Sequence, residues 1–126
     1  MKEIIKNVGQ RLKEVTNYRF LRWRGEPKYP YFVGELLEMG DGDESGTAEY
    51  RFILTGFYRG DDDICLYEDA ESIKEIFPED GGCMVQCKDG GMLVSWDSMF
   101  PDIPTDTDTE LTKMQITLNV KRWKGK

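Results

Sequence analysis

The sequence of 126 residues contains no histidine. Histidine is the commonest general base and the commonest metal ligand in proteins, so its absence leaves Ser45, Ser72, Ser95 and Ser98 without the usual activating partner. The glycine-rich phosphate loop and the dinucleotide-binding fingerprint are missing as well. The sequence does not exclude a pair of carboxylates spaced as in a glycoside hydrolase. However, any protein with 24 acidic residues contains some such pair, so a pair alone is no evidence for catalysis. We therefore expect no enzymatic activity, no cofactor and no metal site.

Long apolar runs are also lacking. No segment approaches the 18 or more apolar residues of a membrane-spanning helix, and the first 15 residues have no apolar core of a secretory signal, so we expect no membrane partner. Cysteine is scarce and odd in number, at positions 65, 83 and 87. An odd count predicts free thiols in a reducing compartment. Because two cysteines alone are a weak zinc signal, we interpret Cys83 and Cys87 as buried apolar thiols.

The charge that is present is unevenly distributed. The net charge is −7, and 39% of the residues are hydrophobic, as in a globular protein. Residues 1–28 carry eight Lys and Arg against three Asp and Glu, residues 35–71 carry two against twelve, residues 72–110 carry two against nine, and residues 111–126 carry five against none. An acidic middle argues against a protein that coats nucleic acid. Two interpretations remain: unlike segments pair within one fold, or unlike patches of separate copies meet head to tail.

Hydrophobic periodicity predicts one α+β domain over residues 1–126. We expect a mostly antiparallel β-sheet covered by two helices, with the chain order α-β-β-β-α-β-β-β. Helices are predicted over 2–16 and from the aspartates at 61–63 to Phe77, where Pro78 ends the second one. Strands are predicted over 18–24, 31–39, 48–55, 83–88, 91–99 and 113–121, with a turn over 26–30 and a hairpin turn at Asp89-Gly90.

Two strand segments suggest more than a structural role. Residues 18–24 mix aromatic and arginine side chains, which is typical either of a nucleic-acid stacking surface or of an edge strand with arginine stems lying over aromatic faces. We favour the edge strand because the protein as a whole is acidic. In residues 113–121 apolar and polar side chains alternate strictly. The polar side of that strand is either a solvated sheet face or the wall of an aqueous channel.

Acidic loops are the remaining candidates for a site. Residues 41–46 copy the start of a calcium loop, but Phe52 occupies the place of the required bidentate glutamate, so calcium binding is not expected. We interpret the aspartates at 61–63 as a helix N-cap rather than a magnesium site. Loops 40–47 and 100–108 are polar and long, and we predict that they contact partners. The predicted contact residues are Asp41, Asp43, Glu44, Asp102, Thr105, Asp106 and Asp108.

Several short sequence segments resemble those of the tail-terminator or tail-completion proteins of tailed bacteriophages and prophages. These segments are YPYFVG at 29–34, FILTG at 52–56, RG at 59–60, the helix end at Phe77-Pro78, PDIPTD at 101–106 and QITLNVKRWKG at 115–125. The resemblance implies an α+β subunit of a ring, usually a hexamer, that caps the tail tube and joins it to the head connector. It further implies location in the virion after assembly in the host cytoplasm, with DNA passing through the lumen unbound. An acidic lumen would suit that passage.

Two other hypotheses stay open. In the first, the protein is another neck or head-completion component of the same kind of phage, and the sequence does not distinguish such a component from a tail terminator. Alternatively, the excess of negative charge between residues 35 and 110 belongs to an acidic inhibitor or DNA mimic that occupies a basic groove on a partner. A ring protein should assemble with itself, whereas a mimic should be a monomer or dimer with a salt-sensitive partner.

Overall fold

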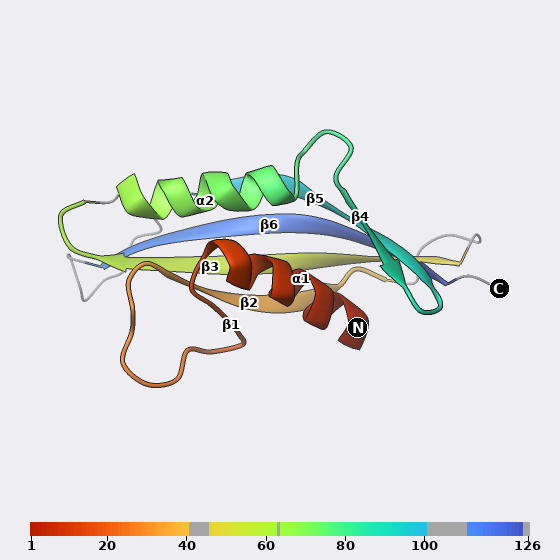
Figure 1. The fold of residues 1–126 in the computed structure, drawn as a ribbon, viewed down its shortest axis with the longest axis horizontal. Coiled ribbons are helices and arrows are strands. Elements are labelled where there is room, and N and C mark those ends of the chain that lie inside the picture. The colour runs from red at the N-terminus through yellow and green to blue at the C-terminus, as the bar shows by residue number, and fades with distance from the viewer. Residues whose placement is uncertain (41–45, 63, 101–110, 125–126) are drawn as a thin grey trace.

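The structure, a computed structural model, describes residues 1–40, 46–62, 64–100 and 111–124. The chain forms a helix, three strands, a second helix and three more strands (Figure 1). Their bounds are α1 Lys2–Val15, β1 Tyr18–Phe20, β2 Tyr31–Glu38, β3 Thr47–Arg59, α2 Ile64–Ile76, β4 Cys83–Cys87, β5 Gly90–Phe100 and β6 Leu111–Lys124. The expected α+β class, with a six-stranded sheet and two helices, is therefore present.

The sheet differs from the expectation in how the strands are paired. Its lateral order is β1-β2-β3-β6-β5-β4, so the last strand of the chain lies in the middle between β3 and β5. The sheet is mixed, because β1 runs parallel to β2 while the other neighbours are antiparallel. The 14-residue β6 gains two long partners in this position, 13-residue β3 and 11-residue β5. Alternation predicts which face each side chain takes, but it does not specify which strands are neighbours.

The predicted strand over 18–24 is wrong beyond Phe20. Leu21 has a φ of 69°, and the Arg22 N–H donates to the Phe20 carbonyl oxygen at 2.9 Å, which makes a γ-turn around Leu21. This turn ends β1 after three residues and sends the chain to the other side of the sheet, where Trp23 contacts Tyr31. Two neighbouring parallel strands need a long connection rather than a tight hairpin. Residues 21–30 provide that connection between β1 and β2.

Both helices cover one face of the sheet. Buried side chains of α1 and α2 join a single core with the even-numbered residues of the long strands. In Figure 1, α1 lies across β2 and β3, and α2 lies along β5 and β6. The core side chains of β3 and β6 are Tyr50, Phe52, Leu54, Met114, Ile116, Leu118 and Val120, as their alternation predicted. The opposite face has no helix among the described residues.

Two glycines allow aromatic rings to lie flat on the covered face. A Cβ atom at Gly56 would sit 2.4 Å from Cε1 of Phe32, its cross-strand partner. A Cβ atom at Gly34 would meet the rings of Phe52 and Tyr18 at 2.7 and 2.8 Å. Gly56 therefore marks a close approach between the backbone of β3 and the ring of Phe32.

The helix ends are held by polar contacts. The Asp62 carboxylate accepts from the Ile64 N–H at 3.2 Å, so an aspartate does cap the start of α2. The Thr16 hydroxyl at the end of α1 donates to the Asp69 carboxylate at 2.9 Å and ties the two helices together. Burial raises the pKa of Asp69, and the Thr16 hydrogen bond opposes this shift.

The β4–β5 hairpin turns one residue earlier than predicted. Cys87 pairs with Gly90, so Lys88 and Asp89 form the turn and Gly90 already belongs to β5. Cys87 is buried and Cys83 is half-buried, and both thiols are free. Their interpretation as apolar thiols is consistent with these positions.

Candidate functional site

The sheet face that no described helix covers is the main candidate site, and we call it the open face. It is formed by odd-numbered residues of β2, β3 and β6 with their neighbours on β5 and β4. The cross-strand rows are Tyr31–Phe57–Lys113, Val33–Thr55–Gln115–Phe100, Glu35–Ile53–Thr117–Ser98, Leu37–Arg51–Asn119–Ser95 and Glu49–Lys121–Leu93–Met84. Each strand therefore contributes to a continuous surface as well as to the core.

The middle of the open face is polar and almost balanced in charge. Uncharged hydrogen-bonding side chains face one another across β6, where Thr55 opposes Gln115 and Ser95 opposes Asn119. The charged groups of the five rows are Glu35, Glu49, Arg51, Lys113 and Lys121. Three cations and two anions do not form the acidic wall that sequence analysis suggested for a lumen.

One end of the open face carries an aromatic stack. The ring centroids of Tyr31 and Phe57 are 4.9 Å apart, and those of Trp23 and Tyr31 are 5.0 Å apart. The Arg19 guanidinium lies 5.0 Å from the Trp23 centroid, and the Lys113 ammonium lies 5.4 Å from that of Phe57. The outer ring faces are thus already occupied by cations of the same chain, as expected for an edge strand.

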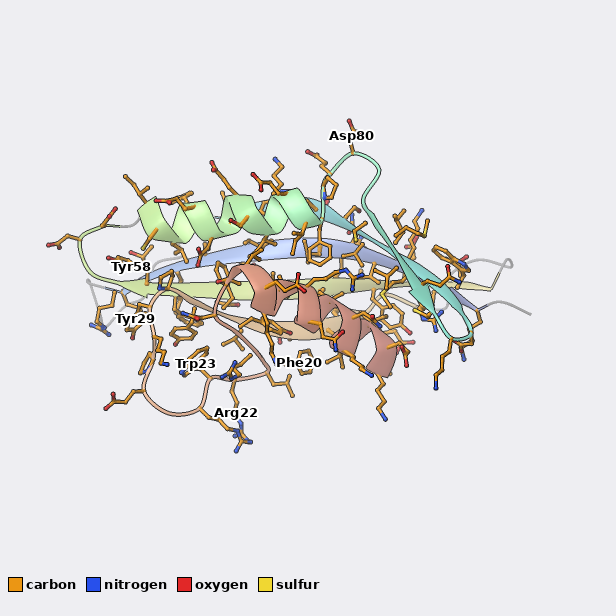
Figure 2. The ribbon with its side chains drawn as sticks, in the orientation of Figure 1. Phe20, Arg22, Trp23, Tyr29, Tyr58 and Asp80 are labelled. Carbon is orange, nitrogen blue, oxygen red and sulfur yellow. The ribbon has the colours of Figure 1, made fainter. Side chains whose placement is uncertain are left out.

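A hollow of about 360 Å³ lies beside this stack. Trp23, Tyr31 and Phe57 form one wall, and Arg22 and Glu35 stand among its lining residues. The sequence does not predict this hollow, because its lining residues come from three separate segments that only the cross-strand register brings together. Figure 2 shows Arg22 and Trp23 together on the chain segment after β1.

Two opposite sides of the molecule carry opposite charge. Next to the hollow, residues 19–28 hold four cations and one anion, and we call this region the basic edge. On the other side, α2 and the turn after it, residues 64–80, hold six anions and one cation, and we call this region the acidic edge. Figure 2 shows Arg22 and Asp80 projecting from opposite sides of the molecule. The uneven charge of the sequence is therefore separated in space rather than neutralised by pairing of these two segments.

No protein-family model and no curated protein matches this chain. The resemblance to tail terminators accordingly stays a prediction. What the geometry adds is an open polar face, a hollow and two edges of opposite charge.

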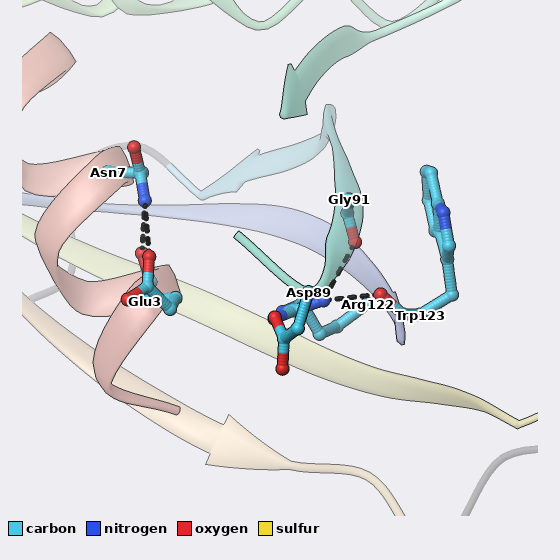
Figure 3. A network of polar contacts seen from close by, with 6 residues as sticks. All are labelled: Glu3, Asn7, Asp89, Gly91, Arg122 and Trp123. Carbon is cyan, nitrogen blue, oxygen red and sulfur yellow. Dashed lines mark hydrogen bonds and ion pairs between the residues drawn. The ribbon is translucent and has the colours of Figure 1, made fainter. Parts of the chain in front are cut away.

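The end of the sheet where β6 stops contains a closed polar network (Figure 3). Arg122 is 8% exposed and donates to the carboxylate of Asp89 and to the carbonyl oxygens of Gly91 and Trp123. The hydrogen bond and charge of Arg122 hold the pKa of Asp89 below its usual value. Nearby on α1, Asn7 donates to the Glu3 carbonyl oxygen at 2.8 Å. The guanidinium of Arg122 is already well bonded, so this network stabilises the strand end rather than offering a ligand site.

The predicted contact residues cannot be placed on this surface. Asp41, Asp43, Glu44, Asp102, Thr105, Asp106 and Asp108 lie outside the described residues, as does most of the calcium-like loop. In the described part of the chain, no three Cys, Asp or Glu side chains gather as a metal site. None of the helices there is long and apolar enough to cross a membrane.

Proposed function

We propose that the protein is a structural ring subunit that caps a bacteriophage tail tube and joins it to the head connector. The observation that carries the proposal, beside the sequence resemblance, is the open face of the sheet. A two-layer subunit with one uncovered sheet face that is polar in its middle can pack its sides against neighbouring copies and still present a wall to a channel. Location in the virion, a ring of six copies, and contacts with tube and connector proteins belong to the same proposal.

The polar middle of the open face, away from the aromatic stack, is suited to line the lumen. DNA binds a surface mainly through cations that neutralise its phosphates, and each such contact adds affinity. Three cations in five rows, next to two anions and many uncharged polar groups, offer few such contacts. For the described residues we therefore propose a nearly neutral wall rather than the acidic lumen of the sequence hypothesis, and the acidic side chains of α2 belong to the other layer.

The test combines purified protein with tail tubes. Negative-stain microscopy and light scattering should show rings with a central hole, or rings on the ends of tubes isolated without this protein. Isolated tubes should stop lengthening when the protein is added. A protein that neither forms rings nor binds tube ends would contradict the proposal.

The acidic edge also favours a second candidate function. Six anions on α2 and its following turn would suit a DNA mimic or an inhibitor of a basic groove. Such a protein should remain a monomer or dimer and should bind a basic partner whose affinity falls steeply with salt. A different neck component of the phage would form rings but would leave tube ends unbound.

A further inference from the structure

The basic edge carries an exposed apolar side chain in a strained position. Leu21 is 65% exposed and has a φ of 69°, a left-handed conformation that is rare for a bulky residue. Backbone strain of this kind is concentrated at functional sites. The turn holds the leucine outward beside the hollow formed by Trp23, Tyr31 and Phe57. It places an apolar anchor next to a pocket, as the centre of a protein interface requires.

Two arginines follow this anchor in the sequence and are not used by the fold. Arg22 and Arg24 are exposed, and neither has an ion-pair partner among the described residues. An apolar centre with an arginine rim is the composition of a protein-binding surface. It calls for an occupant that is acidic and carries apolar side chains of its own.

The acidic edge of the same protein has that chemistry. Ile64, Glu68, Glu71 and Glu75 follow one another at offsets of four, seven and eleven, so they share the outer face of α2. Ile64 is 66% exposed, and the neighbouring Tyr67 is 38% exposed. The three glutamates are exposed and have no ion-pair partner in the part of the chain that the structure describes. The two surfaces are complementary in charge, and each offers an apolar contact.

We infer that the basic edge of one copy binds the outer face of α2 of a second copy. This inference rests on the proposed ring and names the contact that would build it. The two surfaces are different and lie on opposite sides of the molecule, so the contact is heterologous and can repeat around a ring. The accessible surface of 7974 Å² leaves room for two interfaces of about 800 Å² on each subunit.

Charge reversal tests the pairing directly. One variant carries Arg22→Glu and Arg24→Glu, and the other carries Glu71→Lys and Glu75→Lys. Each variant alone faces like charge across the contact, so we expect self-association at least tenfold weaker than that of the wild type, measured by sedimentation and light scattering. Mixed in equal amounts, the two variants should assemble again, because every contact in an alternating ring then joins unlike charges.

A matched control separates this pairing from a general effect of charge. Lys6→Glu with Lys13→Glu makes the same charge change as the arginine variant, but on exposed positions of α1, and should leave assembly unchanged. Circular dichroism checks that each variant is folded. Rescue in the mixture supports the contact, since a merely damaged surface would not be restored by a second damaged copy.

Failure of the inference can be distinguished from failure of the proposed function. If both reversed variants form rings as the wild type does, the contact is wrong while the ring function stands. If the wild type stays monomeric at its highest soluble concentration, the contact is also wrong, and binding to tail tubes then decides the function separately. Rings that follow the predicted pairing but ignore tail tubes would uphold the contact and overturn the function.

Discussion

The two faces of one sheet differ more than any two segments of the chain. On β6, Leu118 is completely buried under the helices, whereas Thr117, its neighbour in sequence, lies on the open face. The same contrast repeats along β3, where Phe52 belongs to the core and Arg51 to the surface. Because successive side chains of a strand point in opposite directions, each strand serves stability with one half of its residues and leaves the other half free for contacts. The covered face should therefore determine whether the protein folds, and the open face and edges should determine what it binds.

The largest effect is expected from a comparison of two adjacent residues of β6, one on the covered face and one on the open face. Leu118→Ala removes a fully buried side chain and should lower the free energy of unfolding by about 2 to 5 kcal/mol, because it leaves a cavity under the helices. Thr117→Ala on the open face should change it by no more than about 1 kcal/mol, the range of strand propensity. Urea unfolding followed by circular dichroism measures both. Similar losses for the two variants would mean that the open face is packed against something as firmly as the core is.

A smaller effect comes from adding an atom instead of removing several. Gly56→Ala places a methyl group against the ring of Phe32, which is buried and cannot move away, so we expect a loss of about 1 to 3 kcal/mol. Gly91→Ala makes the same change on the open-face side of β5, where the new atom meets the ring of Trp123 at 2.8 Å. That ring is only half-buried and lies near the strand end, so it can swing outward, and the Val85 carbonyl oxygen at 3.3 Å needs only a small shift.

Thermal unfolding of the two glycine variants gives the comparison. The melting temperature should fall clearly for Gly56→Ala and should stay close to the wild-type value for Gly91→Ala. A second substitution, Phe32→Leu, should recover part of the loss at Gly56, since it shortens the obstructing side chain. Without that recovery, the close approach between Gly56 and Phe32 would not be the cause of the loss.

The contrast between the faces also explains what the sequence could predict. The alternation in residues 113–121 and the spacing of Leu66, Ala70 and Ile73 identified strand and helix correctly, because both patterns are imposed by burial on the covered face. The γ-turn at Leu21 could not be foreseen in the same way. Tyr18, Phe20 and Trp23 favour strand, and no glycine or proline in residues 18–24 signals the turn that takes the chain to the open face.

The open face was harder to predict for a physical reason. The stack of Trp23, Tyr31 and Phe57 depends on which strands are neighbours and in which register, and a single strand contains neither fact. The central position of β6 is of the same kind, since its alternation suits an inner or an outer strand equally well. The sequence showed how many charges each segment carries, but only the structure showed that the basic and acidic edges lie on opposite sides of the molecule (Figure 2).

The smallest expected effect concerns a polar atom on the covered side. The Tyr18 hydroxyl is buried and has no hydrogen-bond partner among the described residues, so Tyr18→Phe should stabilise the protein by about 1 kcal/mol. Tyr31→Phe makes the same change on the open face, where Tyr31 is only half-buried, and should have an effect within about 0.5 kcal/mol. Denaturant unfolding at pH 7 distinguishes the two. If Tyr18→Phe destabilises the protein, the hydroxyl has a partner after all.

The pH dependence of Tyr18→Phe carries the comparison one step further. Burial raises the pKa of Tyr18 above its usual value of 10.0, so the folded protein keeps this proton at a pH where the unfolded chain begins to release it. The unfolded state then binds fewer protons than the folded state, and the stability of the wild type falls as the pH rises past 10. The phenylalanine variant lacks this ionisation, so its advantage over the wild type should grow between pH 9 and pH 11. An advantage that stays constant over that range would show that the Tyr18 hydroxyl reaches solvent, and it would remove the distinction between the covered and open faces at this residue.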